Sequence, residues 1–165
     1  MKIYADHAAT TAVSDTAMAA MLPCFQGIYA NPSSLHSPGQ RAAEKLVEAR
    51  EIFARNLNAA PREITFTSGG SESDVQALRT GAALGARKGK RHILSTKFEH
   101  HAVLHTLDKL RKEGFDVTLL DVHENGVVRV EDVAAAIRED TALVSVMFAN
   151  NEIGTIQPIA EIGAV

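Results

Sequence analysis

Apolar residues follow two alternating patterns from about residue 64 onward. Short continuous runs predict strands at residues 64–67, 92–95, 117–122 and 143–148. Longer stretches with helical spacing predict helices at about 71–87, 102–113 and 131–138, and the opening of a further helix at 158–165. Alternation of this kind is typical of an α/β fold, with a mostly parallel sheet covered by helices. Because residues 143–148 are almost all apolar, this strand is expected to be buried on both faces.

The pattern before residue 64 predicts two helices joined by an ordered loop. Ser14 is a typical N-cap for the first helix, which Pro23 is expected to end or kink before Gly27. Turn-forming residues dominate the stretch 31–39, and an amphipathic helix is predicted to follow, from about residue 43 to residue 57.

Composition and charge restrict the classes of function. The chain has 165 residues, of which 45% are hydrophobic and 22% charged, as expected for a soluble globular protein. Its net charge of −3 argues against a dedicated nucleic-acid surface, and the basic run at 87–91 is interpreted as a solvated loop after a helix. The longest apolar run, at 142–149, is too short to span a bilayer, so no membrane partner is expected.

Cysteine usage and the first residues favour a cytoplasmic location. Cys24 is the single cysteine, which excludes a disulfide framework or a cysteine-based zinc site within the chain and suits a reducing compartment. The first residues contain no apolar stretch resembling a signal peptide.

A turn between a predicted strand and a predicted helix is the first candidate for chemistry. Gly69 and Gly70 let the backbone approach an anion, and the hydroxyl of Ser71 adds a hydrogen-bond donor. The N-terminus of the following helix presents unpaired N–H groups and a partial positive charge, which suit a phosphate group. The alternative is an ordinary helix cap in which Ser71 and Asp74 form a near capping box, and spacing alone favours it.

Two further polar clusters each follow a predicted strand. The first is at 99–101, and the second is at 150–154, where a turn is the alternative. His101 and His105 lie four residues apart and could bind a metal on one helical face, but no carboxylate or thiol at ligand spacing completes that site, so no metal is expected. Open α/β sheets bind ligands beyond the carboxyl ends of their strands, so three clusters at that edge favour a ligand site.

Five motifs carry a resemblance to a known family. They are YADHAATT at residues 4–11, NPSSLH at 31–36, FTSGGSESD at 66–74, EHHAVL at 99–104 and NNEIG at 150–154. In this order they resemble the cysteine desulfurases of the NifS/IscS type, within the class V aminotransferase-like enzymes that use pyridoxal 5′-phosphate (PLP). The resemblance covers essentially the whole chain and implies a partial type I PLP-dependent transferase fold. It divides the chain into an N-terminal segment at 1–13 and an incomplete PLP-binding large domain at 14–165.

The resemblance implies roles for four residues. Gly70 and Ser71 would hold the PLP phosphate, with Ser71 in place of the family's usual threonine. His100 would stack on the pyridine ring and act catalytically by moving protons, and Asn151 would form a hydrogen bond near the phenolic oxygen of the cofactor. Enzymes of this family convert L-cysteine to L-alanine and pass the sulfur to an enzyme cysteine as a persulfide, which supplies iron–sulfur cluster assembly. A homodimer and a sulfur-acceptor or scaffold protein are the implied partners.

The sequence also departs from the family pattern. Val75 stands where the family commonly has asparagine, which removes a polar group close to the phosphate turn. The resemblance places the Schiff-base lysine and the nucleophilic cysteine beyond Val165, so the chain alone is expected to be inactive. Cys24 is interpreted as a small buried hydrophobic residue, and Lys97 is not expected to replace the missing lysine. The predicted strand at 64–67 is expected to lack some of its family neighbours in the sheet.

Two alternatives remain open at this point. The chain could be a non-catalytic fragment that associates with another chain, or it could belong to a sibling PLP enzyme, a selenocysteine lyase or a class V aminotransferase. The motifs at 99–101 and 150–154 favour a desulfurase over an aminotransferase.

Overall fold

A computed structural model describes residues 3–165, so the first two residues of the predicted segment 1–13 lie outside the described part. The chain divides between Phe66 and Thr67 into two compact units, and each unit is built differently. Within residues 3–165, no helix combines the length and the apolar character needed to cross a bilayer.

The first unit contains the two predicted helices. Helix α1 spans Asp15–Gln26, and the Ser14 side chain accepts a hydrogen bond from the Ala17 N–H at 3.2 Å, which confirms Ser14 as its N-cap. The helix does not end at Pro23, which lies in its last turn, but continues to the C-cap Gly27.

Helix α2 spans Ser37–Asn56 and so begins earlier than its apolar pattern indicates. Its N-cap is His36, whose Nδ1 accepts a hydrogen bond from the Gly39 N–H at 3.2 Å. A Cβ atom on Gly39 would lie 2.4 Å from the Ser34 carbonyl oxygen, so the contact between the helix and the preceding loop requires glycine.

The predicted strand at residues 64–67 does not form. The 3-10 helix η1 (Pro61–Glu63) is followed by an irregular segment, and the described residues contain no strand that pairs with it. Instead, the Arg50 guanidinium donates a hydrogen bond to the Ile64 carbonyl oxygen and lies 4.9 Å from the centroid of the Phe66 ring. A strand is defined by ladder bonds to a neighbour, so the apolar pattern alone cannot produce one here.

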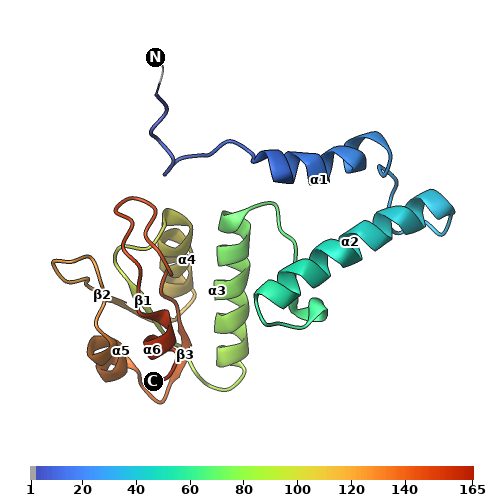
Figure 1. Cartoon of the computed structure of the whole chain (residues 1–165). Helices are drawn as coiled ribbons and strands as arrows, with labels where there is room; N and C mark the ends of the chain where they lie inside the picture. The colour runs from blue at the N-terminus through green and yellow to red at the C-terminus, as the bar shows by residue number, and fades with distance from the viewer. Residues whose placement is uncertain (1–2) are drawn as a thin grey trace. The chain divides into compact units, whose positions relative to one another are not determined.

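The second unit is an α/β layer structure, as predicted (Figure 1). Its elements in chain order are α3 (Gly70–Ala86), β1 (His92–Thr96), α4 (His101–Lys112), β2 (Asp116–Leu120), α5 (Val130–Ala136), β3 (Thr141–Val144) and α6 (Ile159–Ile162). The three strands are parallel in the order β2-β1-β3. Helix α4 connects the neighbouring strands β1 and β2, whereas the connection through α5 passes from β2 to β3 on the other side of β1.

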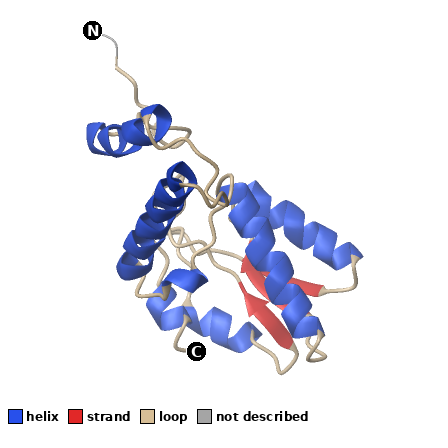
Figure 2. Cartoon of the chain, turned by 90° about the vertical axis from the view of Figure 1, so that its right-hand side faces the viewer, coloured by secondary structure: helices blue, strands red, loops and turns tan. Residues whose placement is uncertain are grey.

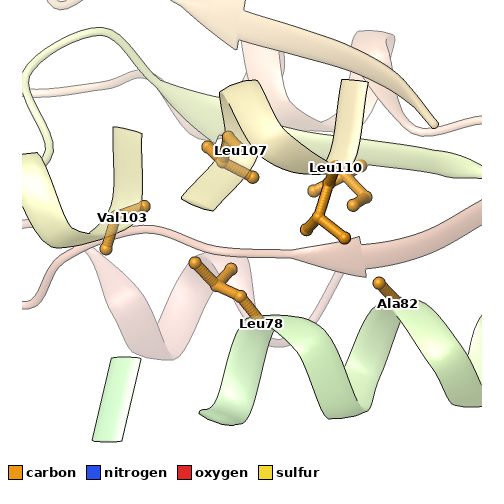
Figure 3. Packing of buried hydrophobic residues seen from close by; sticks show 6 residues of the cluster. Leu78, Ala82, Val103, Leu107 and Leu110 are labelled. Carbon is orange, nitrogen blue, oxygen red and sulfur yellow. The ribbon is translucent and has the colours of Figure 1, made fainter. Parts of the chain in front are cut away.

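Helices cover both faces of this sheet (Figure 2). On one face, Leu78 and Ala82 of α3 pack with Val103, Leu107 and Leu110 of α4 and with Ile93 of β1 (Figure 3). The other face buries Leu94, Val128 and Val133.

Strand β3 is shorter and less buried than its sequence indicates. It ends at Val144, and each of its residues is half-buried. Leu143 packs against the core on one face of the sheet and Val144 against the core on the other, so both faces are covered, but less completely than predicted. The physical reason is its position, because β3 is an edge strand of the described sheet and pairs with β1 on one side.

Candidate functional site

The N-terminus of α3 is a turn with free donors. Gly69 is extended, and the first backbone bond of the helix runs from the Ser73 N–H to the Gly69 carbonyl oxygen at 3.1 Å. The N–H groups of Gly70, Ser71 and Glu72 lie ahead of that bond. A Cβ atom placed on Gly69 or Gly70 would meet no atom within 4 Å, so the space in front of the turn is open.

The predicted capping box of Ser71 and Asp74 is not formed. Gly69 is the N-cap and makes no side-chain cap bond. The Glu72 carboxylate accepts bonds from both the N–H and the hydroxyl of Ser68, each at 2.6 Å, and these bonds lower the pKa of Glu72. Ser71 is left exposed at the open end of the helix, where its hydroxyl can meet a ligand.

His100 is the N-cap of α4. Its Nδ1 accepts a hydrogen bond from the Ala102 N–H at 3.1 Å. This bond assigns the neutral tautomer with its proton on Nε2, so Nε2 is the ring nitrogen that can exchange a proton with a ligand. The ring is exposed and meets the ring of His101 edge-on, with the centroids 6.2 Å apart.

The alternative of a metal at His101 and His105 is not supported. Their ring centroids are 5.6 Å apart, but the described part of the chain holds no group of three His, Cys, Asp or Glu side chains arranged to bind a metal ion.

The two asparagines after β3 have different surroundings. Asn150 is buried, and its Oδ1 accepts hydrogen bonds from the N–H groups of Glu152 at 2.8 Å and Ile153 at 3.0 Å. Asn151 is exposed, and its amide contacts only the Glu152 carboxylate, at 3.3 Å, among the described residues. Asn150 therefore shapes the turn, and Asn151 is available to a ligand.

Two buried side chains that sequence reasoning did not assign join these loops. Glu99 Oε1 accepts bonds from the Thr96 hydroxyl at 3.0 Å and from the Met147 N–H at 2.7 Å, and burial raises the pKa of Glu99. Asn150 Nδ2 donates to the Phe98 carbonyl oxygen at 3.2 Å. Both residues belong to motifs noted in the sequence, but the contacts could not be found there because they join positions about 50 residues apart.

The structure brings the predicted site residues to one edge of the second unit. Figure 1 shows the first turns of α3 and α4 and the loop after β3 at the same end of the sheet. This end is the carboxyl edge of the parallel strands, where α/β folds bind ligands. Gly70, Ser71, His100 and Asn151 share this edge, although within the described part of the chain no hydrogen bond joins them directly.

The two residues considered as substitutes lie in unsuitable surroundings. Lys97 Nζ forms an exposed ion pair with the Asp121 carboxylate at 2.7 Å, whereas a Schiff-base lysine must be desolvated. Cys24 is half-buried in α1, so it is less enclosed than predicted. Val75 is half-buried on α3.

These residues fit the phosphate and ring of PLP. Free N–H groups and a hydroxyl at a helix N-terminus suit a phosphate dianion. An exposed imidazole and an exposed amide at the same edge offer a ring face and a donor.

Comparisons with known proteins identify the family of the chain. The model of the family described as "Aminotransferase class-V" matches residues 3–165. The "Cysteine desulfurase IscS" of Clostridium botulinum (strain Kyoto / Type A2) is 52% identical over 162 residues, which are 98% of this chain and 41% of that protein. A solved structure described as "NIFS-LIKE PROTEIN" superposes with a TM-score of 0.94 at 41% identity, covering 99% of this chain and 45% of that one. Another, described as "SspA in complex with cysteine", gives a TM-score of 0.87 at 38% identity, covering 96% of this chain and 45% of that one.

The chain thus spans less than half the length of the curated relatives and solved structures it matches. Their names favour the desulfurase interpretation over an aminotransferase or a selenocysteine lyase. The fold agrees with theirs and is partial, as the resemblance implied. The chain belongs to the aminotransferase class-V family.

Proposed function

We propose that residues 67–165 form the phosphate-binding and ring-binding part of the PLP site of a cysteine desulfurase. The observation that carries the proposal is the N-terminus of α3. There the N–H groups of Gly70, Ser71 and Glu72 precede the first backbone bond of the helix, and a Cβ atom on Gly69 or Gly70 would meet no other atom within 4 Å.

Each residue has a defined task in this proposal. The N–H groups of Gly70 and Ser71 and the Ser71 hydroxyl bind the phosphate. His100 packs against the ring and exchanges a proton through Nε2, which its bond to Ala102 leaves available. Asn151 donates a hydrogen bond to the oxygen on the ring. PLP, when bound, supplies the electron sink that weakens bonds of an amino acid substrate.

The proposed reaction removes sulfur from L-cysteine and leaves L-alanine, in a homodimer that passes the sulfur to an acceptor protein. The names of the similar desulfurases support this choice of substrate, as does the similarity to SspA, which was solved in complex with cysteine. We assign no step to Lys97, which is paired with Asp121, or to Cys24, which lies in the other unit.

The phosphate site is tested by comparing pyridoxine 5′-phosphate with pyridoxine. Neither compound carries an aldehyde, so neither reacts with surface lysines, and they differ only in the phosphate. The chain is expected to bind the phosphorylated compound at least about tenfold more tightly in equilibrium dialysis, because charge-assisted hydrogen bonds contribute roughly 1.5–3 kcal/mol each. Equal affinities would contradict the proposal.

A matched pair of variants locates that site. Ser71→Asp places a negative charge at the second residue of α3, which favours the helix but repels a phosphate. The control is Ser14→Asp at the start of α1, where aspartate is an equally good N-cap. Only Ser71→Asp is expected to abolish the preference for the phosphorylated compound. A preference that survives in Ser71→Asp would exclude this helix end.

A further inference from the structure

Each of the two proposed ring contacts, His100 and Asn151, directly follows a buried polar residue. Glu99 is 6% exposed and precedes the exposed His100, and Asn150 is 8% exposed and precedes the exposed Asn151. The first pair lies in the β1–α4 loop, residues 97–100, and the second pair lies in the β3–α6 loop, residues 145–158.

The two buried side chains bond to each other's loops. Glu99 reaches across to the β3–α6 loop, where it accepts the Met147 N–H at 2.7 Å. Asn150 reaches back to the β1–α4 loop, where its amide donates to the Phe98 carbonyl oxygen at 3.2 Å. Each side chain also holds its own loop, through Thr96 for Glu99 and through the N–H groups of Glu152 and Ile153 for Asn150.

From this arrangement we infer that Glu99 and Asn150 are positioning residues, a reciprocal clamp that fixes the spacing between His100 and Asn151. The inference rests on the proposed function, since it assigns the clamp to the PLP site. A buried polar network in which each donor is matched to an acceptor rigidifies its surroundings. Neither residue touches the cofactor in this assignment, and each acts through the exposed residue that follows it.

One variant removes the Asn150 donor and keeps the bonds that Asn150 accepts within its own loop; the lost contacts are the bond to the Phe98 carbonyl oxygen and a weak contact with Met147 Sδ at 3.5 Å. Asn150→Asp keeps an oxygen acceptor for the N–H groups of Glu152 and Ile153, but it loses the donor to the Phe98 carbonyl oxygen. The matched control is Thr118→Val, which removes one hydrogen bond to His92 near the amino end of the same sheet.

Residue-resolved amide exchange, measured without cofactor, tests the clamp by itself. In Asn150→Asp, exchange is expected to rise about tenfold at Met147 and Ala102, the equivalent of one lost hydrogen bond, although Asn150 bonds to neither N–H. The Glu152 and Ile153 amides remain protected, and Thr118→Val changes none of the four. If exchange at Met147 and Ala102 is unchanged in Asn150→Asp, the Glu99–Met147 and Asn150–Phe98 bonds are independent of each other, and the inference is overturned.

A second pair of variants covers the Glu99 half. Glu99→Gln keeps the acceptor for the Met147 N–H and is expected not to speed exchange at Met147, Ala102 or Ile153. Glu99→Ala is expected to speed exchange at Ala102 and Ile153 as well as at Met147. If Glu99→Ala speeds exchange only at Met147, the two bonds do not form a clamp. If Glu99→Ala does not fold, the result for Asn150→Asp decides whether the clamp exists.

PLP titration connects the clamp to the site. Asn150→Asp is expected to change the affinity for PLP by less than about threefold, because the phosphate contacts on α3 are intact. The induced circular dichroism of bound PLP, which reports the orientation of the ring, is expected to fall by at least half, while Thr118→Val retains it. An unchanged signal would refute the positioning role. If the original chain binds no PLP, the proposed function fails, and amide exchange still decides whether the clamp exists.

Discussion

Large apolar side chains lie in different surroundings in the two units. In the second unit, Ile93, Leu94 and Leu107 are completely buried between the sheet and its helices. In the first unit, Phe25, Tyr29 and Leu35 are 72%, 80% and 92% exposed. The described residues of the first unit that are buried are small, namely Gly39, Ala42 and Ala54.

The difference shows where the stability of each unit comes from. The second unit closes a core of its own, so burial of apolar area supports its fold. The first unit depends on helix caps and local bonds, such as those of Ser14 and His36. Contiguous exposed apolar surface is typical of a contact with another protein surface. We therefore expect identical substitutions to have different consequences in the two units.

Leucine to alanine should produce the largest contrast. Leu107→Ala in the core is expected to destabilise the second unit by about 2–5 kcal/mol, through lost burial and a residual cavity. Leu35→Ala is expected to change stability by no more than about 0.5 kcal/mol, because that side chain is already in water. Urea unfolding followed by far-UV circular dichroism measures both. Tyr4 and Tyr29, the only tyrosines of a chain without tryptophan, report on the first unit by fluorescence. Equal costs for the two variants would contradict the contrast.

Glutamate to alanine should produce the next largest contrast. Glu99→Ala leaves the half-buried Met147 N–H and the buried Thr96 hydroxyl without their acceptor, which costs about 1–3 kcal/mol. Glu63 also accepts one backbone bond, from the Ala60 N–H at 2.7 Å, but it is exposed, so water can replace it and Glu63→Ala should cost less than about 1 kcal/mol. The same urea series measures both variants, and a cost for Glu63→Ala as large as that for Glu99→Ala would contradict the role of burial.

Glu99→Gln separates the carboxylate charge from its hydrogen bonds. Burial raises the folded-state pKa of Glu99 above its usual 4.5, so the folded chain holds that proton more tightly than the unfolded chain. Stability conferred by this group is therefore present at low pH and lost as the pH rises from 4.5 through the raised pKa. Glu99→Gln should match the original chain near pH 4 and be the more stable of the two at neutral pH. Urea unfolding of both chains at each pH measures this order. If the original chain were the more stable at neutral pH, the buried charge of Glu99 would not be destabilising.

The buried His92 should make the stability of the second unit depend on pH. His92 is fully buried, with Nδ1 2.8 Å from the Thr141 hydroxyl and Nε2 3.0 Å from the Thr118 hydroxyl. Burial lowers the pKa of His92, as does the nearby Arg138, while Asp116 and Asp140 oppose the shift. The unfolded chain therefore binds the proton first as the pH falls below 6.5, and the second unit loses stability from that pH downward.

The pH dependence is measured with two variants. His92→Gln keeps hydrogen-bonding capacity and removes the titrating group. Below about pH 6.5, the slope of the free energy of unfolding against pH should therefore decrease by up to about 1.4 kcal/mol per pH unit, the value for one bound proton. The matched variant is His36→Asn, which keeps a cap acceptor on α2 and leaves His92 in place, so the fall should persist. A fall that persists unchanged in His92→Gln would exclude His92 as its origin.

Most helices and strands of the second unit could be predicted from the sequence, but the hydrogen bonds that position the loops of its candidate site could not. The apolar periods of 92–95 and 102–113 correspond to β1 and α4, because local pattern and burial agree there. Residues 64–67 have an equally good strand pattern, but pairing is a property of neighbours, and this segment bonds to Arg50 instead. Gly70, Ser71, His100 and Asn151 could be proposed from motifs. The supporting contacts of Glu99 and Asn150 could not, because they depend on which loops the fold brings together.

The coupling energies of surface ion pairs should differ least between the units. If they are equally small, the difference between the units lies in their cores and not in their surfaces. Lys97 and Asp121 in the second unit are 2.7 Å apart, and Lys45 and Glu48 in the first are 2.6 Å apart, with all four side chains well exposed. Solvent screening limits such pairs to about 0–1 kcal/mol in either setting. Double-mutant cycles to alanine should therefore give coupling energies below about 1 kcal/mol for both pairs, falling further at high salt. A clearly larger value for the Lys97 pair would mean that the units differ in their surface electrostatics as well as in their cores, and it would reopen the question of whether Lys97 has a role in the site.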